Sequence, residues 1–382
     1  MTRHERWASA TPESEAQLLR ASIWTGVTTD TVFIMWQSKL TDYLSRQLAY
    51  ESRIRVHAKR IVEDTRSLVR TLLPWRHLED VCPPTLSIET TNICNADCVF
   101  CGCQFQEDFR NGGGVMTEGI FERALKQYRE MGGRNIRLTP LVGEPLVDPN
   151  IVRRVQSARD KGFNVSFFTN GLLFGRMDID AFLKTGIDHI VLSAAPFEKS
   201  CFELLFRTEG YHELIAGLKK LLTIRNELDA PLRITILFRS HIPYKDLVAL
   251  PDYRTEILPL LTEEERKAVY VRTKTFDTWG GQIRKKDLVG IMDLALAPLI
   301  RWKPCCWTFS PMVLWDGRVR ACASRFAATK GKDGDDGLLM GNLAESRLED
   351  IWHGAEFKDL RRRFLAGDLP LVCRKCTMYR SC

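Results

Sequence analysis

The chain has 382 residues, of which 45% are hydrophobic and 27% charged, as in a soluble globular protein of two or three domains. The net charge of +7 is spread along the chain, and no arginine–glycine repeat or interleaved aromatic-basic motif indicates nucleic-acid binding. No apolar run approaches the roughly 18 residues of a membrane span, and the N-terminus lacks an apolar export signal, so we expect a cytoplasmic protein. Twelve cysteines in such a chain favour metal binding over disulfides.

Residues 1–80 form a basic, helix-prone region. The run from Thr31 to Leu73 contains neither glycine nor proline, and its apolar residues recur among many charged ones. This pattern predicts one long helix or a helical pair. We expect a helical N-terminal extension that either covers one flank of the next domain or recruits substrate or a second copy of the chain.

From residue 85 onward, short apolar segments alternate with helical patterns. The predicted strands are 85–89, 135–139, 164–168, 189–193, 232–238 and 268–272. The predicted helices are 118–131, with Thr117 as its N-cap, 149–160, 179–184 and 211–228. This alternation predicts an α/β fold with a parallel sheet buried by helices. Six such units over residues 81–290 make a partial (βα)6 TIM-like barrel, whose active site should lie at the C-terminal ends of the strands.

Three cysteines directly follow the first predicted strand. Cys94, Cys98 and Cys101 have the spacing C-x3-C-x2-C, and an aromatic residue, Phe100, precedes the third. Three thiolates on one loop can hold three corners of a 4Fe–4S cluster and leave the fourth iron open to a small molecule. A structural zinc site, the alternative, normally brings its fourth ligand nearby. The position after a barrel strand favours the cluster, since catalytic loops lie there.

Further candidate site residues follow the second, third and fourth strands. They are Gly143, Glu144, Pro145, Thr169, Asn170 and Ser193. By themselves, Gly-Glu-Pro and Asn-Gly are turn signals, and a serine can simply be solvated. Their positions at the ends of strands make a role in the site the stronger interpretation.

Residues 291–382 differ again in pattern, and residues 305–382 contain six of the twelve cysteines. Cys305, Cys306 and Cys322 come first, and a C-x2-C-x5-C run closes the chain. One clear helix is predicted over 347–365. With so little apolar strand, this small domain is expected to need a metal to fold. A zinc ribbon is the alternative to an iron–sulfur cluster here.

The triad with its aromatic residue, the Gly-Glu-Pro turn and the C-terminal cysteine order together resemble the radical S-adenosylmethionine (AdoMet) enzymes that carry a SPASM or twitch domain. The resemblance covers residues 85–382. In that family the triad holds a 4Fe–4S cluster, and AdoMet chelates its open iron. Reductive cleavage of AdoMet then gives a 5′-deoxyadenosyl radical. One departure is Val142, which stands where the family has the first glycine of Gly-Gly-Glu-Pro.

The resemblance assigns roles to the candidate residues. It implies AdoMet contacts at Phe100, Gly143, Glu144, Pro145, Thr169, Asn170 and Ser193. Because the chain stops at Cys382, we expect one auxiliary 4Fe–4S cluster rather than two. Its expected ligands are Cys306, Cys322, Cys373 and Cys376, and Cys305 or Cys382 can replace one of them, since spacing cannot decide between adjacent thiols. The expected electron donor is a flavodoxin or ferredoxin.

Two reactions of a small polar substrate, such as a sugar or aminocyclitol in natural-product biosynthesis, fit this resemblance. In related dehydrogenases the auxiliary cluster accepts an electron from the substrate radical. In epimerases a thiol returns a hydrogen atom instead, and Cys201, after the fourth strand, is the candidate here. Cys82, Cys103 and whichever of Cys305 and Cys382 binds no cluster are the others. Each of these thiols can equally be a buried structural cysteine.

A dehydrogenase also needs a base for the hydroxyl proton. Lys199, Arg239 and Asp277 follow strands four, five and six and are the candidates; the last two can also bind a polar substrate, and all three can be solvated surface residues. The nearby Trp279-Gly280-Gly281 turn either lines the pocket or closes a loop.

Two other functions remain open. Maturation of a ribosomally made peptide is the first alternative, although the N-terminal region lacks the pattern of a winged-helix peptide-binding domain. A non-catalytic iron–sulfur or zinc protein that binds a partner through its basic extension is the second. The intact triad argues against the second alternative, because a scaffold has no need of an open iron.

Overall fold

The computed structural model divides the chain into two units, residues 1–55 and 56–382. It describes residues 61, 64, 65, 82–105, 113–240, 242, 244–267, 270–273, 275–301, 304–323 and 337–380. The predicted N-terminal extension therefore lies almost entirely outside the described residues. None of the described helices is long and apolar enough to cross a membrane.

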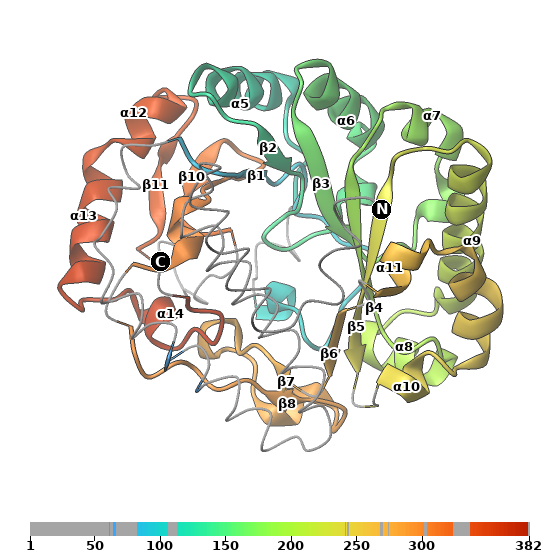
Figure 1. Cartoon of the computed structure of the whole chain (residues 1–382). Coiled ribbons are helices and arrows are strands. Elements are labelled where there is room, and N and C mark those ends of the chain that lie inside the picture. Colours follow the sequence, from blue (N-terminus) through green and yellow to red (C-terminus); the bar gives the residue numbers. More distant parts are fainter. Residues whose placement is uncertain are drawn as a thin grey trace, which may run out of the picture. The chain divides into compact units, whose positions relative to one another are not determined.

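Six parallel strands follow one another across the sheet in the order of the sequence (Figure 1). They are β1 (Leu86–Ile88), β2 (Asn135–Arg137), β3 (Asn164–Thr169), β4 (His189–Ala194), β5 (Arg233–Ser240) and β6 (Tyr270–Thr273). Each contains part of a predicted strand. Along β3, Val165 and Phe167 are fully buried, whereas Ser166 and Phe168 are half-buried. The same alternation in β4 indicates one face packed under helices and one facing a more open interior, as in a partial barrel.

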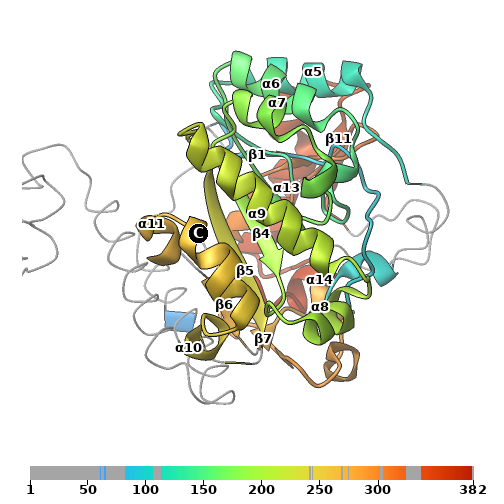
Figure 2. The same cartoon turned by 90° about the vertical axis from the view of Figure 1, so that its right-hand side faces the viewer.

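Helices connect these strands and cover the outer face of the sheet (Figures 1 and 2). They are α5 (Glu118–Glu130), α6 (Ile151–Asp160), α7 (Ile179–Lys184), α8 (Lys199–Phe206) and α9 (Tyr211–Glu227). The prediction of Thr117 as an N-cap is confirmed, because its side chain accepts a bond from the Ile120 backbone. The short helix α8 was not predicted, and it adds a second helix between β4 and β5.

The C-terminal segment extends the same sheet beyond β1. Strand β9 (Met312–Val313) pairs in parallel with β1, and β10 (Arg318–Arg320) and β11 (Leu339–Asn342) follow in antiparallel order. The barrel and the C-terminal cysteine-rich region therefore share one nine-stranded sheet. Because β9 pairs directly with the strand that precedes the cysteine triad, the two cysteine regions are joined by backbone hydrogen bonds.

The remaining elements are short. Between β5 and β9 lie α10 (Tyr244–Leu247), α11 (Glu263–Lys267), β7 (Thr275–Phe276), β8 (Asp293–Leu294) and several helical turns, among them η8 (Trp279–Gly281). The predicted helix 347–365 is two helices, α12 (Leu348–Trp352) and α13 (Ala355–Leu365), because Gly354 takes an extended conformation between them. A last helix, α14 (Leu371–Arg374), carries Cys373.

Candidate functional site

The cysteine triad lies on the loop that leaves β1, and this loop is held by its backbone. The amide of Asp97 donates to the carbonyl of Phe206 at 3.2 Å, and the amide of Val99 donates to that of Leu205 at 3.0 Å. Both acceptors lie at the C-terminal end of α8, so the helix that sequence reasoning missed supports the triad. These bonds fix the loop through groups that are independent of the thiols.

The three thiols are close enough together to influence one another. Burial raises the pKa of Cys94 to about 12, and the nearby charges of Glu144 and Cys101 add to the effect. Burial also raises the pKa of Cys98 well above its usual value, and Cys101 and Cys94 contribute. A thiolate in such a place needs a compensating positive charge, which iron ions supply. The donor set therefore fits an iron–sulfur cluster held by Cys94, Cys98 and Cys101.

The ring of Phe100, the residue before Cys101, packs against two aromatic rings and lies beneath the guanidinium of Arg239. Its ring packs against Phe206 at 5.3 Å and Phe276 at 5.2 Å between centroids. The guanidinium of Arg239 lies 4.7 Å from the Phe100 centroid and 4.9 Å from that of Phe276. Its Nε donates to the Ser193 hydroxyl at 2.9 Å, so two residues predicted to lie in the site are in contact.

Glu144 joins the loops that follow β2 and β3. It is 2% exposed, and one carboxylate oxygen accepts bonds from the Thr169 hydroxyl at 2.5 Å and the Leu146 amide at 3.1 Å. The other oxygen accepts from the Asn170 amide at 2.7 Å. Burial raises the pKa of this carboxyl to about 7, against the effect of these bonds. Because both oxygens are engaged within the protein, we infer that Glu144 positions the loops around AdoMet.

The same loops touch the triad segment. The Asn170 side-chain amide donates to the side chain of Asn95 at 2.8 Å, and the Glu144 amide donates to the carbonyl of Ile93 at 2.9 Å. Asn95, next to Cys94, is a member of this site that sequence reasoning missed. Its only signal was its place inside the cysteine motif. The structure thus gathers the candidate AdoMet residues from the ends of β1, β2 and β3 into one network.

Gly143 allows this close approach. Its φ is +129°, and a Cβ atom there would lie 2.8 Å from the carbonyl oxygen of Thr91 and 3.0 Å from the backbone of Asn92. We expect Gly143→Ala to destabilise the protein by about 2 kcal/mol and to weaken AdoMet binding about tenfold, because the turn must move away from the triad.

Thermal unfolding and equilibrium dialysis of AdoMet on the iron-loaded protein measure both effects. Gly119→Ala is the matched control, since an added Cβ there meets nothing within 4 Å and α5 should gain stability by roughly 0.5–1 kcal/mol. Equal behaviour of the two variants would contradict the role given to Gly143.

Lys199, Cys201 and Asp277 are the other candidates for catalysis. Lys199 is exposed at the start of α8 and pairs with Glu203 at 3.8 Å. Cys201 is buried on the same helix, where burial raises its pKa to about 11. Asp277 is buried and accepts a bond from the backbone amide of Trp279 at 2.7 Å. This bond gives Asp277 a role in holding the turn that contains Trp279.

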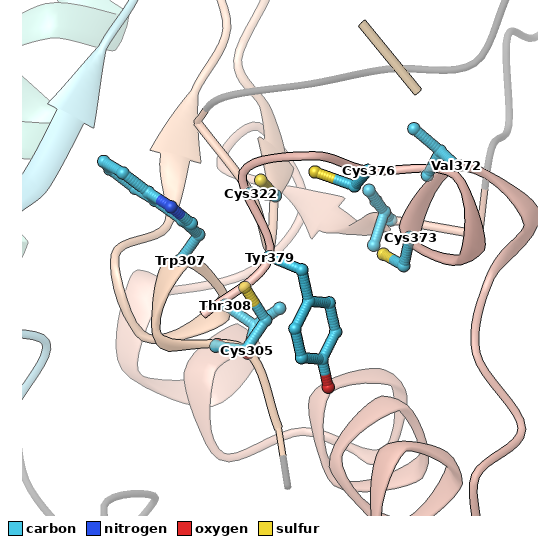
Figure 3. A pocket seen from close by; sticks show the side chains of 9 residues that line it. Cys305, Trp307, Thr308, Cys322, Val372, Cys373, Cys376 and Tyr379 are labelled. Carbon is cyan, nitrogen blue, oxygen red and sulfur yellow. The ribbon is translucent and has the colours of Figure 1, made fainter. Parts of the chain in front are cut away.

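A second group of four cysteines lines one cavity in the C-terminal segment (Figure 3). Three chain segments contribute the cysteines: the start of the helical turn η10 (Cys306–Phe309), the end of β10, and the region of α14. The lining residues are Cys305, Cys322, Cys373, Cys376, Trp307, Thr308, Leu338, Val372 and Tyr379. A wall that is largely apolar with four thiols as its reactive groups fits an iron–sulfur cluster.

The structure places Cys305, and not Cys306, at this cavity. Cys305 is extended and buried, whereas Cys306 begins η10 and is disulfide-bonded. Of the two adjacent thiols, only that of Cys305 lines the cavity. We therefore propose Cys305, Cys322, Cys373 and Cys376 as the ligands, in place of the expected set with Cys306. Cys382 lies outside the described residues.

A zinc site would require several ligands to converge on one ion. Within the described ranges, no three His, Cys, Asp or Glu side chains are placed to hold a single metal ion. A cubane cluster spreads its four cysteine ligands over four irons, and four thiols around one cavity suit such a cluster.

Two family models match the regions of the chain that contain these cysteines. Residues 88–226 match the model of the radical SAM superfamily. The chain belongs to this superfamily, and its cofactors are a 4Fe–4S cluster and AdoMet. Residues 305–377 match the SPASM iron–sulfur cluster-binding domain. The chain is therefore a radical AdoMet enzyme of the SPASM group, with auxiliary iron–sulfur binding in its C-terminal segment.

Solved structures share the fold. SuiB from Streptococcus suis, bound to the precursor peptide SuiA, matches with a TM-score of 0.51 at 16% identity, over 83% of this chain and 74% of that one. BtrN in complex with AdoMet and 2-DOIA matches with a TM-score of 0.47 at 16% identity, over 77% of this chain and 92% of that one. At these identities the likeness concerns the fold alone.

Proposed function

We propose that this enzyme dehydrogenates a small polar substrate, of the sugar or aminocyclitol kind, by oxidising a secondary alcohol to a ketone. When bound, the reduced cluster and AdoMet supply a 5′-deoxyadenosyl radical, which removes a hydrogen atom from the substrate carbon. The residual substrate radical must then lose one proton, to a base or to solvent, and one electron to become a ketone. Methionine, 5′-deoxyadenosine and the ketone are the products.

The four-cysteine cavity is the observation that carries this proposal. Oxidation of a substrate radical requires an acceptor for one electron, and a second iron–sulfur cluster held by Cys305, Cys322, Cys373 and Cys376 would provide it. The shared sheet and the backbone pairing of β9 with β1 hold this cavity in a fixed relation to the triad. A single-cluster enzyme would have no need of this arrangement.

Epimerisation is less well supported because it needs a thiol that can approach the substrate. Cys201 packs in the hydrophobic core, 7% exposed, and the aromatic ring of the adjacent Phe202 stacks on Phe206 at 4.8 Å. A thiol enclosed in this way is typical of a structural cysteine. This placement argues against Cys201 as the thiol that returns a hydrogen atom.

Peptide maturation is the alternative that shares the same fold, since SuiB binds a precursor peptide. The preference for a small substrate comes from the sequence of the N-terminal region, in which no winged-helix pattern is found. A flavodoxin or ferredoxin is the proposed source of the first electron.

Mass spectrometry of products formed in deuterated water tests the reaction type. With candidate polyols and aminocyclitols, we expect a mass loss of two hydrogens and no solvent deuterium on carbon. Deuterium gained at carbon without oxidation would instead indicate epimerisation through a thiol. Turnover of a precursor peptide and of no polyol would replace the small-molecule proposal by peptide maturation.

A further inference from the structure

The turn that follows β7 lies between the two cysteine regions. It consists of Thr278, Trp279, Gly280 and Gly281, of which the last three form η8. Trp279 is 8% exposed, although it stands in a turn.

On one side the turn holds the triad loop. The Trp279 indole Nε1 donates a hydrogen bond to the carbonyl oxygen of Phe100 at 2.9 Å. This oxygen belongs to the peptide bond that joins Phe100 to Cys101. The indole is therefore bonded to the peptide directly before a proposed ligand of the radical-generating cluster.

On the other side the turn holds the auxiliary loop in the same manner. The Thr278 hydroxyl donates to the carbonyl oxygen of Lys375 at 3.0 Å, and the Thr278 amide donates to the Thr377 hydroxyl at 3.2 Å. The Lys375 oxygen belongs to the peptide bond directly before Cys376, another proposed ligand. Close packing accompanies these bonds, since a Cβ at Gly280 would lie 2.5 Å from the Val372 side chain.

The backbone of the turn is strained. The contacts on both sides of the turn explain why this strained conformation is retained. Trp279 has φ +48°, in the left-handed region that bulky side chains avoid, at a cost of about 1–2 kcal/mol. The Asp277 carboxylate holds this conformation by accepting the Trp279 amide at 2.7 Å. Strain that is stabilised by its surroundings is concentrated at functional positions.

We propose that Trp279 is a positioning residue that couples the two cluster sites, and that the Thr278–Trp279 turn provides the bonded route for an electron between them. The route runs from the peptide before Cys376 through the Thr278 hydroxyl, the turn and the indole to the peptide before Cys101. This proposal rests on the proposed function in that each cysteine set holds a cluster.

The coupling has a clear use in dehydrogenation. AdoMet cleavage consumes one electron, and oxidation of the substrate radical releases one. An electron returned along the turn to the triad site would allow the next cleavage, so that substrate oxidation supplies the electron that each later turnover requires. The electron count then closes without further external reductant after the first turnover.

Freeze-quench electron paramagnetic resonance tests this route without knowledge of the substrate. The full, iron-loaded chain is reduced at both clusters, freed of excess dithionite and mixed with AdoMet. We expect one equivalent of 5′-deoxyadenosine to form first and a second to form as the auxiliary-cluster signal disappears. In Trp279→Phe, which keeps the ring and loses the N–H donor, the disappearance of that signal should slow about tenfold.

Two further variants sharpen the test. Thr278→Val removes the hydroxyl that bonds to Lys375 and should slow the same step from the other side of the turn. Trp352→Phe is the matched control, because it removes a buried indole that packs against Phe357 and Arg361. In Trp352→Phe, the electron paramagnetic resonance signal of the auxiliary cluster should decay at the wild-type rate.

Decay at the wild-type rate in Trp279→Phe and Thr278→Val, with the full iron content of about eight atoms, would overturn the proposal. Loss of about four irons in both variants would also overturn it, since the turn would then only stabilise the auxiliary site. An auxiliary signal that persists in the wild-type enzyme would exclude the route. About four irons in the wild-type enzyme would instead contradict the proposed function.

Discussion

Replacement of Cys94, Cys98 or Cys101 by alanine is expected to abolish the formation of 5′-deoxyadenosine. Each variant removes one of the three thiolates that hold the cluster, and AdoMet then has no open iron to bind. The fold should survive, because the loop is fixed by the backbone bonds of Asp97 and Val99 to the end of α8. Chromatographic assay of 5′-deoxyadenosine with dithionite as reductant, together with circular dichroism, measures the two effects.

Cys201→Ala is the matched control for this series. Its thiol is buried in the first turn of α8, the helix whose C-terminal end supports the triad loop, but it lies outside the triad. The variant should still cleave AdoMet, with at most a modest loss of stability from the removed sulfur. Cleavage retained in any one of the three triad variants would show that the triad is not the cluster site.

The second prediction distinguishes the roles of two adjacent cysteines, Cys305 and Cys306. Cys305→Ala should lower the iron content from about eight to about four atoms per chain and reduce the thermal stability of the C-terminal segment, because a ligand of the auxiliary cluster is lost. Cys306→Ala should retain about eight atoms, because this residue does not line the cavity. Colorimetric iron analysis after anaerobic reconstitution makes the measurement.

The two variants differ by one position in the chain, so general damage to the segment affects both. If the iron content falls in Cys306→Ala and not in Cys305→Ala, the ligand set that contains Cys306 is right and the assignment of Cys305 is wrong. Loss of cluster in both variants would mean that the two thiols act together. Replacement of Cys322 or Cys376 should behave like that of Cys305.

Much of the fold followed from periodicity. Strand β3 and helix α5 match their predicted positions closely, because buried strands and amphipathic helices leave regular apolar patterns. The triad and the Gly-Glu-Pro turn were also recognisable, since the chemistry of a cluster restricts both residue type and spacing. The bond from the Glu144 amide to the Ile93 carbonyl brings these two segments together at the ends of the strands.

The direction in which a side chain points and the pairing of segments that are distant in the sequence could not be predicted. The spacing of Cys305 and Cys306 does not reveal which side chain faces inward, because the answer depends on the local backbone conformation. The pairing of β9 with β1 joins residues more than 200 positions apart, and a two-residue strand has no periodicity to detect. The role of Trp279 likewise depends on hydrogen bonds to loops that are distant in sequence.

The most direct test of the central claim is the cleavage of AdoMet by the full chain after anaerobic reconstitution. With dithionite we expect equimolar methionine and 5′-deoxyadenosine from protein that contains about eight irons. An iron-loaded protein that forms no 5′-deoxyadenosine under these conditions would contradict the assignment of the chain as a radical AdoMet enzyme with two clusters.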